Sequence, residues 1–208
     1  SRNRIAAINA TNGTIDAGFN PGSGVGYDVY DLLVSGTRLY LGGGFTSYNG
    51  TSRNGIAAVS PTTGALDVTF DPGNGTGSNS NGRNWVRTVA LTGSRLYVGG
   101  YFSTYNPTAR RNVAAISTAT GALDTGFNPG TGANDFVYAL AISGARLYLA
   151  GSFTSYNGSA RTRLAAVDAA TGALDTGFLP GTGANGTIQT LAVSGSRLYA
   201  GGDFTTFA

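Results

Sequence analysis

The 208-residue sequence contains no cysteine, histidine, methionine, lysine or glutamate, and only 11% of its residues are charged. Without cysteine there is no disulfide framework, and without cysteine or histidine there is no ligand set for zinc. No apolar run reaches the roughly 18–20 residues of a bilayer-spanning helix, and no signal peptide is visible. The missing initiator methionine and the start inside a repeat fit a mature or excised chain. We expect no metal, no cofactor and no membrane span.

Catalytic side chains are scarce, because all 13 cationic residues are arginine and all 10 acidic residues are aspartate. Histidine, cysteine, lysine and glutamate supply most general bases and nucleophiles. Two of Asp28, Asp31 and Asp135 could in principle act as a glycosidase pair, but they come from unlike positions of the repeat described next. The net charge of +3 is weak for a nucleic-acid partner. We therefore expect a protein that is not an enzyme and binds no nucleic acid.

A unit of about fifty residues is repeated four times. An Arg-Leu-Tyr motif begins at Arg38, Arg95, Arg146 and Arg197, and these positions are 57, 51 and 51 residues apart. A Leu/Ile-Asp-x-x-Phe motif has its aspartate at Asp16, Asp67, Asp124 and Asp175, and these positions are 51, 57 and 51 residues apart. The period is therefore 51, and six extra residues lie within Asp71–Trp85. We expect these arginines and aspartates to form repeated structural pairs within or between units.

Each unit is predicted to consist of short strands, because no segment has a sustained 3.6-residue apolar period. In the third complete copy we expect strand A at Val137–Ser143, strand B at Arg146–Tyr156, strand C at Arg163–Asp168 and strand D at Ala173–Phe178. Short antiparallel strands in a unit of about 40–50 residues are typical of a propeller blade. The predicted fold class is all-β, a β-propeller with four blades of four antiparallel strands.

The chain begins inside one blade and ends inside the same blade. We expect a single domain over residues 1–208, with blades at 27–85, 86–136 and 137–187 and a fourth blade split between 1–26 and 188–208. Pairing of the N-terminal C–D strands with the C-terminal A–B strands would close the ring and leave no unpaired edge. The same halves could instead complete a neighbouring molecule, in a swapped dimer or a filament. We favour the self-closed monomer, because a short intramolecular closure loses less entropy.

The stretches RLYLAGSFTSYNG, RLAAVDAATGALD and GFLPGTGAN, with their copies, resemble the delta-60 type β-propeller repeat of bacterial secreted and surface proteins. The run Ala166–Asp175 is also distantly similar to a quinoprotein (PQQ-type) blade, but the docking tryptophan of that pattern is absent. The resemblance implies a propeller at the cell surface or outside the cell. Our own expectation is a structural or adhesive module, with a subunit of an extracellular filament or array as the alternative. It implies no specific activity and no functional residues.

The B–C and D–A loops of a propeller share one face, and here they present tyrosine and asparagine, which suit stacking on sugars and hydrogen bonding to them. The predicted ligand-binding residues are Tyr48, Asn49, Tyr105, Asn106, Tyr156, Asn157 and Trp85. The alternative for the loops is that tyrosine packs the loop base and Asn-Gly makes the turn. Trp85, the only tryptophan, breaks the fourfold pattern together with the long loop; its alternative role is a hydrophobic lid. The expected partner is a protein or a glycan.

Every copy of the repeat has a phenylalanine shortly after the glycines of strand B, and we predict that this residue lies in the core of each blade. The four residues are Phe45, Phe102, Phe153 and Phe204. Replacing Phe153 by alanine should lower the free energy of unfolding by about 3–5 kcal/mol, because a buried ring is replaced by a cavity. Urea denaturation of the two proteins measures this difference. A loss below about 1 kcal/mol would mean that the ring is exposed and the strand register is wrong.

Overall fold

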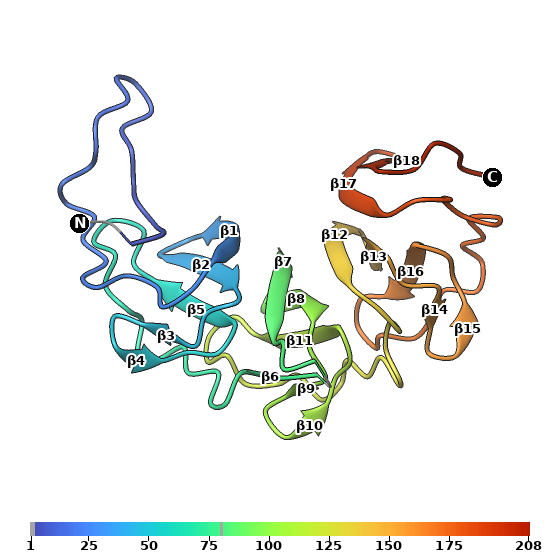
Figure 1. Cartoon of the computed structure of the whole chain (residues 1–208), viewed down its shortest axis with the longest axis horizontal. Coiled ribbons are helices and arrows are strands. Elements are labelled where there is room, and N and C mark those ends of the chain that lie inside the picture. Colours follow the sequence, from blue (N-terminus) through green and yellow to red (C-terminus); the bar gives the residue numbers. More distant parts are fainter. Residues whose placement is uncertain (1–2, 80) are drawn as a thin grey trace.

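The computed structural model describes residues 3–79 and 81–208. Residues 1 and 2 of the expected split blade and residue 80 of the long loop lie outside the described residues. The sheets follow one another along an open arc, and their first strands line its concave side (Figure 1). Within the described ranges no helix has the length and hydropathy needed to cross a membrane.

Among the described residues, three of the three-stranded sheets are blades with the strands in the expected order A, B, C. Blade 1 consists of β1 (Val29–Ser35), β2 (Arg38–Gly43) and β5 (Ile56–Val59). Blade 2 consists of β7 (Trp85–Thr92), β8 (Arg95–Tyr101) and β11 (Val113–Ser117). Blade 3 consists of β12 (Val137–Ser143), β13 (Arg146–Gly151) and β16 (Leu164–Asp168). A two-stranded sheet of β17 (Ile188–Ser194) and β18 (Arg197–Gly202) follows.

The B–C loops are shaped by two-residue strands. These are β3 (Ser47–Tyr48) with β4 (Thr51–Ser52), β9 (Thr104–Tyr105) with β10 (Thr108–Ala109) and with β6 (Thr76–Gly77), and β14 (Ser155–Tyr156) with β15 (Ser159–Ala160). The predicted strand B, which ran on to Tyr156, therefore ends at Gly151, and its last part belongs to a separate hairpin.

The predicted strand D is wrong as a full strand, since Ala173–Phe178 makes a single bridge from Leu174 to Val167. The cause is the aspartate of the repeated motif. One carboxylate oxygen of Asp175 accepts the backbone N–H of Gly177 at 2.9 Å, so the chain turns where a strand would continue. The same turn occurs at Asp124 and Gly126. Each complete blade is thus three strands plus one bridge.

The phenylalanine position predicted from the repeat is a core position in the complete blades. Phe45, Phe102 and Phe153 are fully buried. Phe45 lies in the hydrophobic cluster of blade 1, Phe102 in a cluster shared by blades 1 and 2, and Phe153 in a cluster shared by blades 2 and 3. Phe204 is only partly buried, against the cluster around β17 and β18. The fourth copy therefore has the composition of a blade without the cover of a complete one.

The predicted pairing of the two sequence motifs is confirmed in the complete blades. The Arg Nε and Asp Oδ2 atoms lie 2.6, 2.5 and 2.6 Å apart, respectively, in the pairs Arg38–Asp67, Arg95–Asp124 and Arg146–Asp175. Each pair joins the start of strand B to the turn after strand C in the same blade.

The same arginines also reach the next blade. Arg95 Nη1 and the Tyr97 hydroxyl both donate to the Ala169 carbonyl of blade 3, at 3.3 and 2.6 Å. Arg38 Nη1 and the Tyr40 hydroxyl donate in the same way to the Thr118 carbonyl of blade 2, the tyrosine at 3.0 Å. We call this arrangement the blade clamp: an arginine and a tyrosine of one blade on a turn carbonyl of the next.

The expected ring closure is not made within this chain. Residues 3–19 form a hairpin bridged at Ile8 and Ile15, which stands at the opposite end of the arc from β17 and β18 (Figure 1). Phe19 at its base is buried in the cluster of blade 1, so the hairpin is held beside that blade. The packing between successive blades sets the curvature of the arc, and this curvature leaves the two half-blades apart.

The Arg38–Asp67 pair of blade 1 should make the free energy of unfolding depend on pH in the acidic range. Burial alone would raise the pKa of Asp67, but hydrogen bonds from Thr69 and Arg38 lower the pKa from 3.8 to about 2. A carboxylate with a lowered folded pKa stabilises the fold above its unfolded pKa, and this stabilisation is lost as the pH falls toward the folded value. Asp67→Asn should therefore cost about 1 kcal/mol of unfolding free energy at pH 7 and much less near pH 2.

Urea denaturation at the two pH values measures this effect. The matched control is Asp203→Asn, because Asp203 is exposed and its side chain accepts one hydrogen bond, from Gln189. An Asp67→Asn protein whose loss of stability is the same at both pH values would contradict the assignment.

Candidate functional site

The tyrosines predicted to bind ligand are core residues. Tyr48, Tyr105 and Tyr156 are fully buried, and their hydroxyls donate to the carbonyls of Gly64, Gly121 and Gly172 at 2.5, 2.6 and 2.8 Å. Burial raises the pKa of Tyr48 to about 12, and it also raises the pKa of Tyr105 and of Tyr156. A ring with no exposed face cannot stack on a sugar, so this part of the prediction is corrected in favour of loop packing.

The asparagines that follow these tyrosines hold two loops together. Asn49, Asn106 and Asn157 have φ angles of 44°, 50° and 45°, a left-handed conformation that asparagine tolerates better than most residues. Their Oδ1 atoms accept the backbone N–H groups of the preceding D–A loops, at Ser23, Asn74 and Thr131, at 3.0, 2.8 and 3.1 Å. Their side-chain carbonyl oxygens are therefore already occupied by hydrogen bonds within the protein.

Trp85, the remaining predicted residue, belongs to a group of aromatic side chains at the start of the inner strands. Its ring lies 6.0 Å from that of Tyr30 and 6.1 Å from that of Phe136. Phe136 stacks on Tyr101 at 3.8 Å and on Tyr138 at 5.2 Å. We call these five residues the aromatic cluster. All of them are partly buried, so each ring is held by packing and keeps some exposed surface.

A β-bulge recurs at this place in every copy. In β7 the register shifts between Val86 and Thr88, so the intervening Arg87 is the extra residue. The opposing strand has glycine there: a Cβ atom on Gly100 would lie 1.9 Å from the Trp85 carbonyl oxygen. The bulged residues of the four copies are Tyr30, Arg87, Tyr138 and Gln189. A bulge re-aims the side chain that it carries, and here it directs a varied set of side chains to one place.

Arg87 lies between the two bulged tyrosines. Its guanidinium carbon is 4.2 Å from the ring centre of Tyr30 and 5.4 Å from that of Tyr138, at cation–π distance from both. Arg83 lies in the same way over Trp85, at 4.6 Å. Within residues 3–79 and 81–208, Arg87 forms no ion pair with a carboxylate. Its charge is positioned by aromatic rings rather than neutralised.

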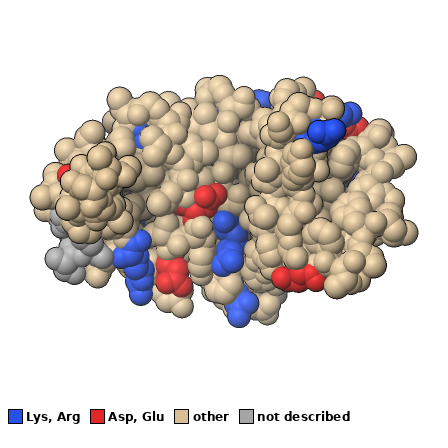
Figure 2. All heavy atoms as spheres, turned by 90° about the horizontal axis from the view of Figure 1, so that it is seen from above, with Lys and Arg blue, Asp and Glu red and all other residues tan. Residues whose placement is uncertain are grey.

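The four bulged residues line a hollow of about 460 Å³ on the concave side of the arc. Figure 2 shows this side with only a few charged side chains, of both signs, near its middle. Thr190 and Leu191 from β17 complete the wall opposite Tyr30 and Asp31. We call the hollow together with the aromatic cluster the inner-strand site.

The polar groups of the site are mostly neutral or already bonded. Burial raises the pKa of Tyr30 and Tyr138, so both hydroxyls remain neutral donors at physiological pH. Asp31 accepts the backbone N–H of Val89 at 2.7 Å, and Gln189 donates to Asp203 at 3.0 Å. No group of three metal-ligating side chains occurs in the part of the chain that the structure describes. The arrangement can stack on a ligand and bind an anion.

The sequence pattern singled out Trp85 but not the bulged residues. The available signal was their variation: Tyr30, Arg87, Tyr138 and Gln189 occupy one repeat position, directly after a residue that is valine or isoleucine in every copy. A bulge cannot be recognised from the alternation of apolar and polar residues alone, because one extra residue in a strand simply reverses which positions of the alternating pattern are apolar.

Comparisons with known proteins support the fold. Residues 38–70, 94–127 and 146–178 match the model of a domain of unknown function described as DUF5122 beta-propeller, which supports a β-propeller repeat fold for these three stretches. Among solved structures, the computationally designed Ika4 protein matches with a TM-score of 0.57 and 16% identity, over 86% of this chain and 88% of that one. The designed Ika8 protein matches with a TM-score of 0.51 and 14% identity, over 91% of this chain and 59% of that one. These similarities show the fold alone. No curated protein sequence matches the chain significantly.

The structural role assigned to the loop tyrosines can be tested at Tyr105. Replacing it by phenylalanine should lower the free energy of unfolding by about 1 kcal/mol, because the Gly121 carbonyl loses its hydroxyl donor in a buried place. Tyr27→Phe is the matched control, since that ring is half exposed. If both variants unfold at the urea concentration of the parent protein, the buried hydrogen bond contributes nothing.

Proposed function

We propose that the chain is a non-enzymatic propeller module that binds a glycan at the inner-strand site. The observation that carries the proposal is Arg87, held between two tyrosine rings beside the aromatic cluster and above a hollow. Aromatic walls with a few fixed polar groups are the usual composition of a small-molecule site. The rings suit the apolar faces of sugars, and the amide of Gln189 and the tyrosine hydroxyls suit sugar hydroxyl groups.

The guanidinium of Arg87, which has no carboxylate partner among the described residues, favours an acidic glycan over a neutral one. A planar guanidinium binds a carboxylate or a sulfate with two parallel hydrogen bonds. The aromatic rings that flank Arg87 restrict its rotamers, so less side-chain entropy is lost when the anion binds. A uronic acid or a sulfated sugar would combine stacking with this charge contact. Proteins are the alternative class of partner for the same face.

The setting that fits this role is outside the cell. The resemblance to delta-60 type repeats and the surface rich in asparagine, glycine, threonine and serine support a secreted or cell-surface bacterial protein. A structural or adhesive role follows if the rigid blades hold the site in place. We propose that the four repeats make four blades, three complete and one in two halves, and that joining such halves closes a ring.

A glycan array with neutral, uronic-acid-containing and sulfated sugars tests the proposal. The parent chain should retain acidic sugars, and Trp85→Ala should weaken this retention about tenfold or more, as expected for an aromatic contact residue. Arg87→Gln should remove the preference for acidic over neutral sugars while the fold is kept, because Arg87 has no structural ion pair.

Leu179→Ala is the control, since Leu179 is one of the most exposed apolar side chains and lies outside the site. Its array pattern should equal that of the parent chain. A parent chain that retains no glycan, or a Trp85→Ala chain that binds as well as the parent, would overturn the proposed function.

A further inference from the structure

The two half-blades carry surfaces that match each other. The β17–β18 sheet lacks the third strand that β5, β11 and β16 supply in the complete blades. By the repeat, the missing strand has the sequence of residues 5–9, which lie in the N-terminal hairpin. In blade 1 the equivalent contacts include Leu41 opposite Ala57, so the matching pair would be Ala200 opposite Ala6.

Apolar side chains that are buried in complete blades are exposed on both halves. Ile8 is 60% exposed, whereas its counterpart Val59 is 0% exposed. On the other half Tyr199 is 54% exposed, whereas its counterpart Tyr40 is 2% exposed. Joining the halves would cover both, and exposed apolar surface of this kind marks an interaction site.

The charges are also complementary. Asp16 already makes the turn of the other motif aspartates, because its Oδ1 accepts the N–H of Gly18 at 2.8 Å. In the three complete blades the second carboxylate oxygen binds the motif arginine. Within the described residues Asp16 and Arg197, the remaining members of the two motifs, form no ion pair. Each is thus the partner that the other lacks.

The blade clamp shows the same gap one blade earlier. In blade 2, Arg95 and Tyr97 donate to the Ala169 carbonyl. Their equivalents in blade 3 are Arg146 and Tyr148, and by the repeat their acceptor would be the Ala10 carbonyl of the hairpin turn. Arg146 and Tyr148 instead line an open hollow beside Leu198.

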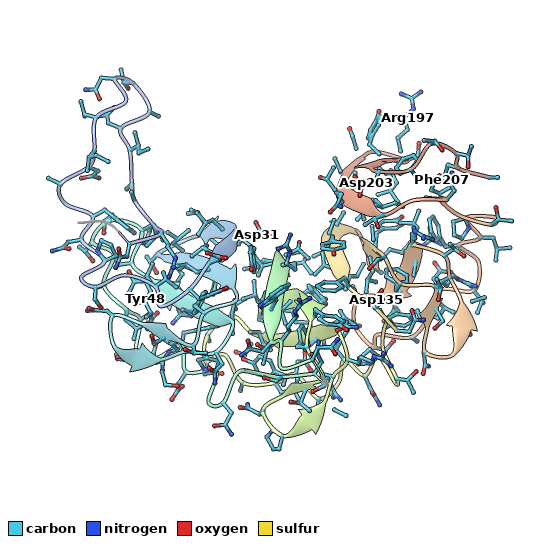
Figure 3. The ribbon with its side chains drawn as sticks, viewed as in Figure 1. Asp31, Tyr48, Asp135, Arg197, Asp203 and Phe207 are labelled. Carbon is cyan, nitrogen blue, oxygen red and sulfur yellow. The ribbon has the colours of Figure 1, made fainter. Side chains whose placement is uncertain are left out.

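We propose that the hairpin of a second copy of this chain fills this place. The copy's own hairpin is fixed to blade 1 through Phe19, at the far end of the arc from β18. In Figure 3, Arg197 projects at the other end of the arc, away from that hairpin. Self-closure would have to move the hairpin away from blade 1 or change the packing between blades. Docking of two copies as rigid bodies leaves those interfaces as they are, which is the usual behaviour on association.

The assembly follows from two-fold symmetry. The hairpin of each copy completes the β17–β18 sheet of the other, so both interfaces are the same. The ring would hold six complete blades and two blades completed across the interfaces, with no open sheet edge. The inner-strand sites of both copies would face one common channel.

Light scattering of the 208-residue chain over a dilution series should give twice the chain mass of 21.0 kDa. The chain has no cysteine, which allows a pairing test. Ala6→Cys chains and isotope-labelled Ala200→Cys chains, prepared separately and then mixed, should form a mixed disulfide dimer. Each chain carries one cysteine and cannot form a disulfide within itself, so this product arises only between two copies. The control is a mixture of Ala6→Cys chains with Ser159→Cys chains, because Ser159 lies in β15, outside the two sheet edges that are proposed to pair.

Charge reversal tests the contact itself. Arg197→Asp should raise the dissociation constant of the dimer about tenfold or more, and adding Asp16→Arg to the same chain should restore it. The matched control is Arg111→Asp, an exposed arginine away from both half-blades. A concentration-independent monomer, a series of larger polymers, or equal cross-linking in the control pair would overturn the proposal.

Discussion

The structure depends on the blade clamp, in which an arginine and a tyrosine from one blade donate to a turn carbonyl of the next. Because the same arginine also binds the motif aspartate of its own blade, it fixes the turn after strand C and the angle between blades with one side chain. The apolar clusters between sheets are less directional, since many packings bury similar area. The charged pair and the shared carbonyl select one of them, and repetition of that choice produces the regular arc.

This regular framework allows one position to vary. The bulge at the start of each inner strand is enforced by glycine on the opposite strand, where a Cβ atom would strike a backbone carbonyl. The residue that the bulge pushes out contributes little to the blade, so it can be tyrosine in two copies, arginine in another and glutamine in the last. An approximately fourfold scaffold thereby carries an asymmetric site.

The sequence predicted the class of fold and the inner strands well, because both follow from repetition. Strand A of blade 3 has the predicted bounds, and the Arg–Asp pairs join the two motifs that recur with the same spacing. The prediction that the loop tyrosines contact a ligand was wrong, because the exposure of a side chain depends on the direction in which its hairpin folds back. Tyr105, for example, folds inward and donates to the carbonyl of Gly121, 16 residues away. Strand D was overestimated because its motif aspartate binds its own backbone.

The expectation that the chain closes into a ring by itself was the one that the local sequence pattern could support least. Complementarity between the two halves is readable from the repeat, since Asp16 and Arg197 belong to motifs whose other members pair. Whether the halves meet within one chain or between two depends on the angle between blades, a quantity set by many small contacts. Entropy favours a single chain when no strain results. If the interfaces fix an angle too small to close four blades, this advantage is outweighed, and the same complementary surfaces join two molecules.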